Sequence, residues 1–109
     1  MKKRTLGPFS ISAIGLGAMP LSMNNDNELP DRASAIATVH AALDAGVTLI
    51  DTADIYAPSW DAMGHNEELV AEALASWGGD RSSIVVTTKG GITRTEEKDF
   101  GRDGSLPYL

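Results

Sequence analysis

The sequence contains no cysteine, which excludes disulfide bonds, cysteine-based metal sites and a thiol nucleophile. It also lacks any run approaching the ~20 apolar residues of a membrane-spanning helix. Positive charge is scarce, since nine Lys and Arg residues stand against fifteen Asp and Glu residues, for a net charge of -6. Such an acidic chain lacks the basic surface with which proteins bind nucleic acid or anionic membranes. We therefore expect a cytoplasmic protein with no nucleic-acid or membrane partner and no metal site.

The rest of the composition is that of an ordinary globular domain. Hydrophobic residues make up 42% and charged residues 22% of the 109 positions, which is too apolar for a disordered chain. The basic residues 2–4 and the apolar stretch over residues 9–23 imitate a secretory signal, but Gly, Pro and Ser residues interrupt that stretch. We interpret the segment as a basic surface start followed by short strands.

Short apolar segments predict β-strands. They are expected at residues 2–6, 9–12, 12–17, 47–50 and 83–88, and the first two form a hairpin joined at Gly7 and Pro8. The last two are near-continuous apolar runs, which indicates strands buried on both faces. Loops are expected at residues 20–30, 51–65 and 90–109. In the last of these, Ser105 with Pro107 marks the start of a further helix.

Two segments have the periodicity of amphipathic helices. The first begins at an N-cap, Asp31, and ends at about Ala45, before Gly46. The second is expected to be capped by Asn66 and to end before Gly78. Its apolar face consists of Leu69, Val70, Ala73, Leu74 and Trp77.

The order of these elements is a hairpin followed by β-α-β-α-β, which predicts parallel βαβ units with right-handed crossovers. Two arrangements remain open at this point: a doubly wound sheet, and the opening of a (β/α)8 barrel. A dinucleotide fingerprint at residues 15–20 fails, because Pro20 replaces its third glycine and a loop follows where the phosphate-binding helix should begin.

Three side chains with complementary chemistry follow the buried strands. Asp51 ends the second parallel strand, Tyr56 lies five residues later, and Lys89 ends the third strand. Because neighbouring strands lie ~4.8 Å apart, Asp51 and Lys89 could form an ion pair over which Tyr56 folds back. An ammonium beside a phenol stabilises the phenolate, so the tyrosine could act as general acid toward a carbonyl oxygen. The same residues could equally be a structural salt bridge and a packed loop tyrosine.

Several motifs together resemble the aldo-keto reductase family over essentially the whole chain. They are Asp51-Thr52-Ala53 followed by Tyr56, the helix start at residues 64–69, the strand ending Thr88-Lys89-Gly90, and the opening segments at residues 4–7 and 14–19. The resemblance implies an α/β fold, the N-terminal part of a (β/α)8 TIM barrel. Residues 1–109 would form a single incomplete domain, with a capping hairpin at 1–12, β-α-β-α-β at 13–89, and the long loop at 90–109.

The resemblance also implies roles for individual residues. Asp51, Tyr56 and Lys89 correspond to three members of the family's catalytic tetrad, with Tyr56 as proton donor and the fourth member, a histidine, beyond residue 109. A nicotinamide would contact residues Gly17, Ala18 and Met19 together with Asp51, and the implied cofactor is NADPH. Trp60 and Met63 could line a substrate pocket, or could equally cover the end of a neighbouring helix.

Three functions remain open. The first is NADPH-dependent reduction of small aldehydes or ketones by a longer enzyme, since a complete barrel needs ~250 residues. The second is an inactive fragment or interaction piece, which could self-associate through the open sheet edge. The third is a cofactor-binding, non-metabolic relative of the channel-subunit type.

Overall fold

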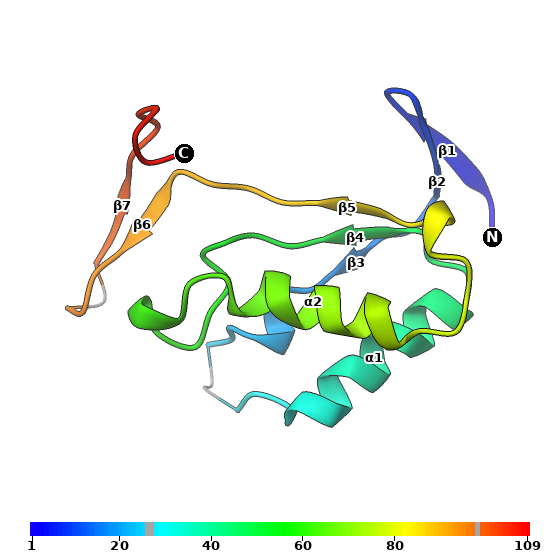
Figure 1. Cartoon of the computed structure of the whole chain (residues 1–109), viewed down its shortest axis with the longest axis horizontal. Coiled ribbons are helices and arrows are strands. Elements are labelled where there is room, and N and C mark those ends of the chain that lie inside the picture. The colour runs from blue at the N-terminus through cyan, green and yellow to red at the C-terminus, as the bar shows by residue number, and fades with distance from the viewer. Residues whose placement is uncertain (26–27, 98) are drawn as a thin grey trace.

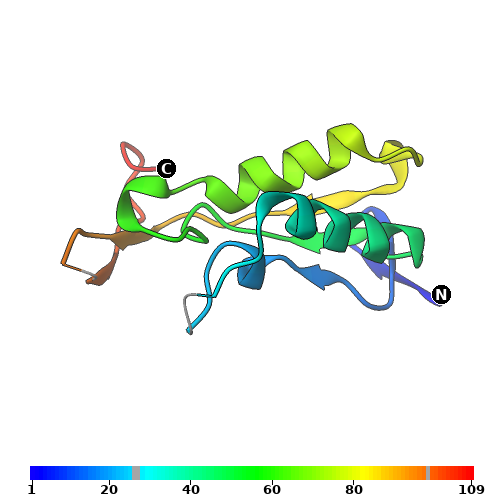
Figure 2. The same cartoon turned by 90° about the horizontal axis from the view of Figure 1, so that it is seen from below.

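Three parallel strands form the centre of the fold. The computed structural model describes residues 1–25, 28–97 and 99–109, so parts of the expected loops at 20–30 and 90–109 lie outside the described residues. Strands β3 (Leu16–Gly17), β4 (Leu49–Asp51) and β5 (Val85–Thr87) lie side by side in that order. Helices α1 (Arg32–Asp44) and α2 (His65–Ser76) connect them and cover the same face of the sheet (Figures 1 and 2). The expected β-α-β-α-β order is confirmed.

Helix α1 begins and ends as its sequence predicts. The side chain of Asp31 accepts a hydrogen bond from the backbone N–H of Ser34 at 2.9 Å, which satisfies one of the free donors at the helix start. After the helix, Gly46 adopts a φ of 96°, a left-handed conformation that glycine reaches without steric cost.

Helix α2 begins differently, and the expected capping role of Asn66 is wrong. The N-cap is Gly64, with a φ of 92°, and Asn66 lies inside the first turn with no exposed surface. The reason is that its side-chain amide is used in the interior. It donates to Ala18 O and to Ser22 Oγ, both at 2.8 Å, and accepts from Thr52 Oγ1 at 2.6 Å.

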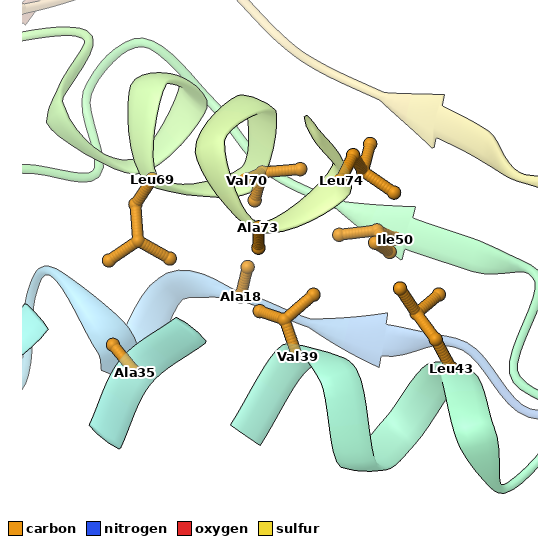
Figure 3. Packing of buried hydrophobic residues seen from close by; sticks show 9 residues of the cluster. All are labelled: Ala18, Ala35, Val39, Leu43, Ile50, Leu69, Val70, Ala73 and Leu74. Atoms are coloured by element: carbon orange, nitrogen blue, oxygen red, sulfur yellow. The ribbon is translucent and has the colours of Figure 1, made fainter. Parts of the chain in front are cut away.

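The core lies between the sheet and the two helices. Figure 3 shows its side chains pointing toward one another from α1, α2, β4 and the segment after β3. The members are Ala18, Ala35, Val39, Leu43, Ile50, Leu69, Val70, Ala73 and Leu74. Trp77 packs partly against this cluster, as its place on the apolar face predicts, and its indole N–H donates to Asp44 at 2.8 Å. Burial of each large apolar side chain contributes about 1.5–3 kcal/mol.

Strand β5 corrects the expectation of burial on both faces. Val86 pairs in register with buried Ile50 and so lies on the helix side, where it lines a hollow with Val70 and Leu74 of α2, yet it is 42% exposed because no described helix covers this edge of the sheet. Each of the three strands is also shorter than the segment predicted from the sequence, because only residues 16–17, 49–51 and 85–87 pair with a neighbouring strand. The arrangement is therefore an open part of a barrel.

Two hairpins lie at opposite ends of the sheet (Figure 1). Strands β1 (Lys3–Leu6) and β2 (Phe9–Ser12) pair antiparallel at the end where the parallel strands begin, as expected for a bottom cap. Strands β6 (Ile92–Arg94) and β7 (Phe100–Arg102) pair antiparallel at the opposite end, within the segment expected to be a loop. The segment 105–109 forms a hydrogen-bonded turn at Ser105 and no further helix. Across residues 1–25, 28–97 and 99–109, no helix has the length and apolarity to cross a membrane.

Candidate active site

The candidate site lies at the carboxyl ends of the parallel strands. Asp51 is the last residue of β4 and is paired in register with Gly17 at the end of β3 and with Thr87 at the end of β5. Lys89 follows two residues after Thr87, and Tyr56 lies in the loop between β4 and α2. Parallel pairing thus brings side chains from three separate segments to one edge of the sheet, where barrel enzymes build their sites.

The ammonium group of Lys89 is the centre of this cluster. Its Nζ donates hydrogen bonds to Asp51 Oδ2 at 2.8 Å, to the carbonyl of Thr52 at 2.9 Å and to the hydroxyl of Tyr56 at 3.2 Å. An ammonium has three N–H donors, so all three are used. The Tyr56 hydroxyl accepts from Lys89, which leaves its own proton available to another acceptor.

Asp51 is fixed at both carboxylate oxygens, since Thr87 Oγ1 donates to Oδ1 at 2.8 Å. The hydrogen bond from Lys89 lowers the pKa of Asp51, against the opposing effect of partial burial, and Thr87 adds to the lowering. Partial burial acts to lower the pKa of Lys89, but its bonds to Asp51 and Tyr56 outweigh that effect and raise it. Both groups are therefore charged at neutral pH. Their side chains are 43% and 47% exposed, so the pair contributes at most about 1 kcal/mol to stability.

The lowered pKa of Asp51 predicts an acid dependence of stability. The ordinary pKa is 3.8, and the folded value lies below it, so the unfolded chain takes up this proton first as the pH falls. The stabilisation is present above pH 3.8 and is lost as the pH falls through the folded pKa. We expect Asp51→Asn to remove this part of the acid dependence, measured by urea unfolding at a series of pH values. Identical pH profiles for the two proteins would contradict the assignment.

The segment after β3 offers an open surface beside Asp51. A Cβ placed on Gly17 would meet no atom within 4 Å, and Met19, which begins a 3₁₀ turn (Met19–Leu21), is 39% exposed. Ala18, which is also expected to contact the nicotinamide, lies between these two residues. It is fully buried, its N–H donates to Asp51 O at 2.9 Å, and its carbonyl accepts from Asn66. Ala18 therefore packs beneath this surface, and Gly17 and Met19 form the surface itself.

The two expected pocket residues lie further along the loop that carries Tyr56. Trp60 begins a 3₁₀ turn (Trp60–Ala62) and is 45% exposed, and Met63 follows it half-buried. A cavity of about 460 Å³ lies beside the same loop, but neither residue is among those that line it. Its lining is Met23, Asn24, Asn25, Leu29, Ala57, Pro58, Arg94 and Phe100.

Asn66 is a site residue that the sequence interpretation missed. Its buried amide links the segment after β3, through Ala18 and Ser22, to Thr52 directly after Asp51. Its position near a helix start, where asparagine is a common cap, favoured a capping role instead. A buried position within the first turn is visible only once the three segments are assembled.

We expect Asn66→Ala to lower the free energy of unfolding by about 3 kcal/mol, because it leaves the carbonyl of Ala18 and the hydroxyls of Thr52 and Ser22 buried without this partner. Urea unfolding measures the change. Asn25→Ala, at an exposed asparagine, is the matched control and should change the value by no more than about 0.5 kcal/mol. Equal stabilities of the two variants would show that the amide does not join these segments.

Comparison with known proteins identifies the family to which the chain is similar. Residues 13–105 match the model of the aldo/keto reductase family. The chain is 40% identical over 85 residues to a 6-dehydroglucose reductase of Novosphingobium aromaticivorans, covering 77% of this chain and 27% of that protein. Among solved structures, it is similar to an aldo-keto reductase from Bacillus halodurans in its holo form, with 33% identity and a TM-score of 0.72 over 99% of this chain and 32% of that one.

A second solved structure, a putative aldo-keto reductase from Pseudomonas aeruginosa, matches with 27% identity and a TM-score of 0.75. This match covers 97% of the chain and 37% of that structure. The chain therefore spans between about a quarter and somewhat over a third of the length of these relatives.

Proposed function

The chain belongs to the aldo/keto reductase family, and from this premise we propose that it contributes three catalytic residues to an NADPH-dependent reductase of aldehydes or ketones. These residues are Asp51, Tyr56 and Lys89. The observation that carries the proposal is the Lys89 ammonium, which bonds both the Asp51 carboxylate and the Tyr56 hydroxyl, at 2.8 and 3.2 Å. The fourth residue of the family's tetrad, a histidine, would come from the strands that complete the barrel.

Tyr56 is the proposed proton donor. Because its hydroxyl oxygen accepts a bond from Lys89, its O–H can point toward the oxygen of a bound carbonyl. As that oxygen gains negative charge, the proton moves to it from Tyr56, and the ammonium stabilises the phenolate that remains. Asp51 keeps Lys89 charged and fixed in position. The phenolate then recovers a proton from solvent, so the residue is unchanged after each turnover.

The residues present fit the reactive end of the implied cofactor. Gly17 has open space above it, lies next to Asp51 in the sheet, and is followed by exposed Met19, so a flat ring can lie against this surface. Bound NADPH would supply the hydride that reduces the carbonyl carbon. By resemblance to the family, the groups that hold the pyrophosphate and the adenosine phosphate come from later strands, so we propose that this chain contributes one wall of the cofactor site.

The relative from Novosphingobium gives a first substrate to test, 6-dehydroglucose, beside simple aldehydes and ketones. The test is consumption of NADPH, followed by its absorbance, in a complete barrel that contains residues 1–109. Carbonyl-dependent consumption with formation of the alcohol is the expected result. Its absence across the panel, in a folded protein, would contradict the proposed reaction.

A second candidate role, association with another strand or with a second copy of the chain, follows from the open edge of β5. This strand pairs only with β4 among the described residues, and its Val86 is 42% exposed. Such an edge favours pairing with another strand, from the rest of a barrel or from a second copy of the chain. The elution size of the 109-residue chain, with and without NADPH, distinguishes self-association from a monomer that needs the remaining strands.

A further inference from the structure

One arginine outside the Asp51–Lys89 pair reaches the loop that carries Tyr56. Arg94 lies on β6, in the hairpin that Figures 1 and 2 place at the same end of the molecule as the β4–α2 loop. Its Nη1 donates to the carbonyl of Ala57 at 2.7 Å and lies 3.5 Å from the carbonyl of Ile55. These are the two residues on either side of Tyr56.

The surroundings of Arg94 show that its charge is directed at the backbone. No carboxylate among the described residues forms a salt bridge with it. Its guanidinium lies 5.4 Å from the ring centre of Phe100 on β7, which holds the side chain against the hairpin. Bonds from a charged donor are shorter and about twice as strong as neutral ones, and the 2.7 Å distance to Ala57 is of this kind.

The carbonyls that Arg94 approaches belong to buried residues. Ile55 is 4% exposed and Ala57 is fully buried, so their polar groups need partners inside the protein. Tyr56 itself is tied by its own backbone, since its carbonyl accepts from the N–H of Asn66 at 3.1 Å. Arg94 and Asn66 thus hold three consecutive carbonyls, which fixes the direction in which the Tyr56 side chain leaves the loop.

We propose that Arg94 is a positioning residue for Tyr56, and that the β6–β7 hairpin serves to deliver its guanidinium to the flanking carbonyls. The inference rests on the proposed function, in which Tyr56 donates the proton. The Tyr56 hydroxyl must stay within reach of both Lys89 and the substrate oxygen, and a displacement of about 1 Å in such a group costs about 100-fold in rate. Arg94 acts through the backbone and touches neither the Asp51–Lys89 pair nor the carbonyl being reduced.

The experiment uses a complete barrel with 3-fluorotyrosine incorporated at position 56, so that the ring reports its own surroundings by ¹⁹F NMR. Arg94→Met keeps the apolar stem of the side chain and removes the charge. Arg94→Lys restores a charged donor that can reach one carbonyl. Arg102→Met, at an exposed arginine of the same hairpin, is the matched control.

We expect Arg94→Met to lower kcat by about 10- to 100-fold, with the KM for NADPH changed by less than about twofold. Its ¹⁹F signal should shift or broaden, because the ring samples other directions. Arg94→Lys should recover part of the kcat and part of the parent ¹⁹F signal. Arg102→Met should match the parent protein in both measurements. If Arg94 served only to stabilise the fold, Arg94→Met would lower the thermal stability without lowering kcat selectively while the KM for NADPH stays the same.

An unchanged ¹⁹F signal together with a kcat within about twofold of the parent in Arg94→Met would overturn the inference. If that variant does not fold, Arg94→Gln is judged by the same two criteria. A parent protein that reduces no carbonyl would instead contradict the proposed function. The ¹⁹F comparison would then still decide whether Arg94 positions Tyr56.

Discussion

Tyr56→Phe in a complete barrel is expected to lower the rate of carbonyl reduction by about 10²- to 10⁴-fold, the usual contribution of a general acid. Phenylalanine keeps the ring and removes only the hydroxyl that accepts from Lys89 at 3.2 Å. The substrate oxygen then loses its proton source at the moment when it gains charge. The measurement is kcat for a carbonyl substrate, together with the dissociation constant of NADPH from fluorescence quenching.

Binding of NADPH should be nearly unchanged in this variant, because the proposed cofactor surface is formed by other residues, Gly17 and Met19. Tyr108→Phe is a suitable control, since it removes an exposed tyrosine hydroxyl that donates to Ile92 O at 3.4 Å and lies outside the Asp51–Lys89–Tyr56 cluster. Normal turnover in Tyr56→Phe would remove Tyr56 from the role of proton donor and leave the cluster as a structural ion pair.

Lys89→Met is expected to be equally damaging to activity and nearly neutral for stability. The variant removes bonds to Asp51, Thr52 and Tyr56 at once, so the phenolate formed during turnover loses the charge that stabilises it. The ion pair is half-exposed, so its loss should cost no more than about 1 kcal/mol. Steady-state kinetics tests the expected loss of activity, and urea unfolding of the same preparation tests the expected small change in stability.

Lys3→Met is the control for charge, because it removes an exposed lysine on β1, at the opposite end of the sheet. Lys89→Arg should not restore full activity, since a planar guanidinium does not reproduce the three bonds of a compact ammonium. A large loss of stability in Lys89→Met, with kcat retained, would mean that the cluster serves folding and not chemistry.

The meeting of Asp51, Lys89 and Tyr56 could be predicted because it depends on few quantities. Two parallel strands of known spacing end side by side, which brings the end of β4 near the end of β5. The register partner of Asp51 is Thr87, and Lys89 reaches Asp51 from two residues further along the chain. The position of Tyr56 depended only on a short loop. The catalytic roles of these residues remain a prediction, because they concern rates and not positions.

Other parts of the site could not be predicted, for physical reasons. Asn66 has the residue type and the place of a helix cap, and only the assembled loops show that its amide bonds Ala18, Ser22 and Thr52 in the interior. Ala18 follows an exposed glycine, and its burial depends on packing against both helices.

The β6–β7 hairpin is the element that the sequence interpretation missed altogether. Each of its strands has three residues, one of them an arginine, and neither has the alternation or the apolar run that identifies a strand. The two strands pair locally, with Arg94 opposite Phe100, but the hairpin also depends on the bond from Arg94 to the carbonyl of Ala57 in the distant loop around Tyr56. The proposed role of Arg94 was therefore out of reach until the fold was known.

The most direct test of Tyr56 as proton donor is a crystal structure of a complete barrel with oxidised cofactor and an unreacted carbonyl substrate. We expect the carbonyl oxygen at about 2.6–3.2 Å from the Tyr56 hydroxyl, the distance required of a proton donor. Lys89 should still bridge Asp51 and Tyr56 in that complex. A carbonyl oxygen held by another side chain, with the Tyr56 hydroxyl turned away, would exclude Tyr56 as the proton donor.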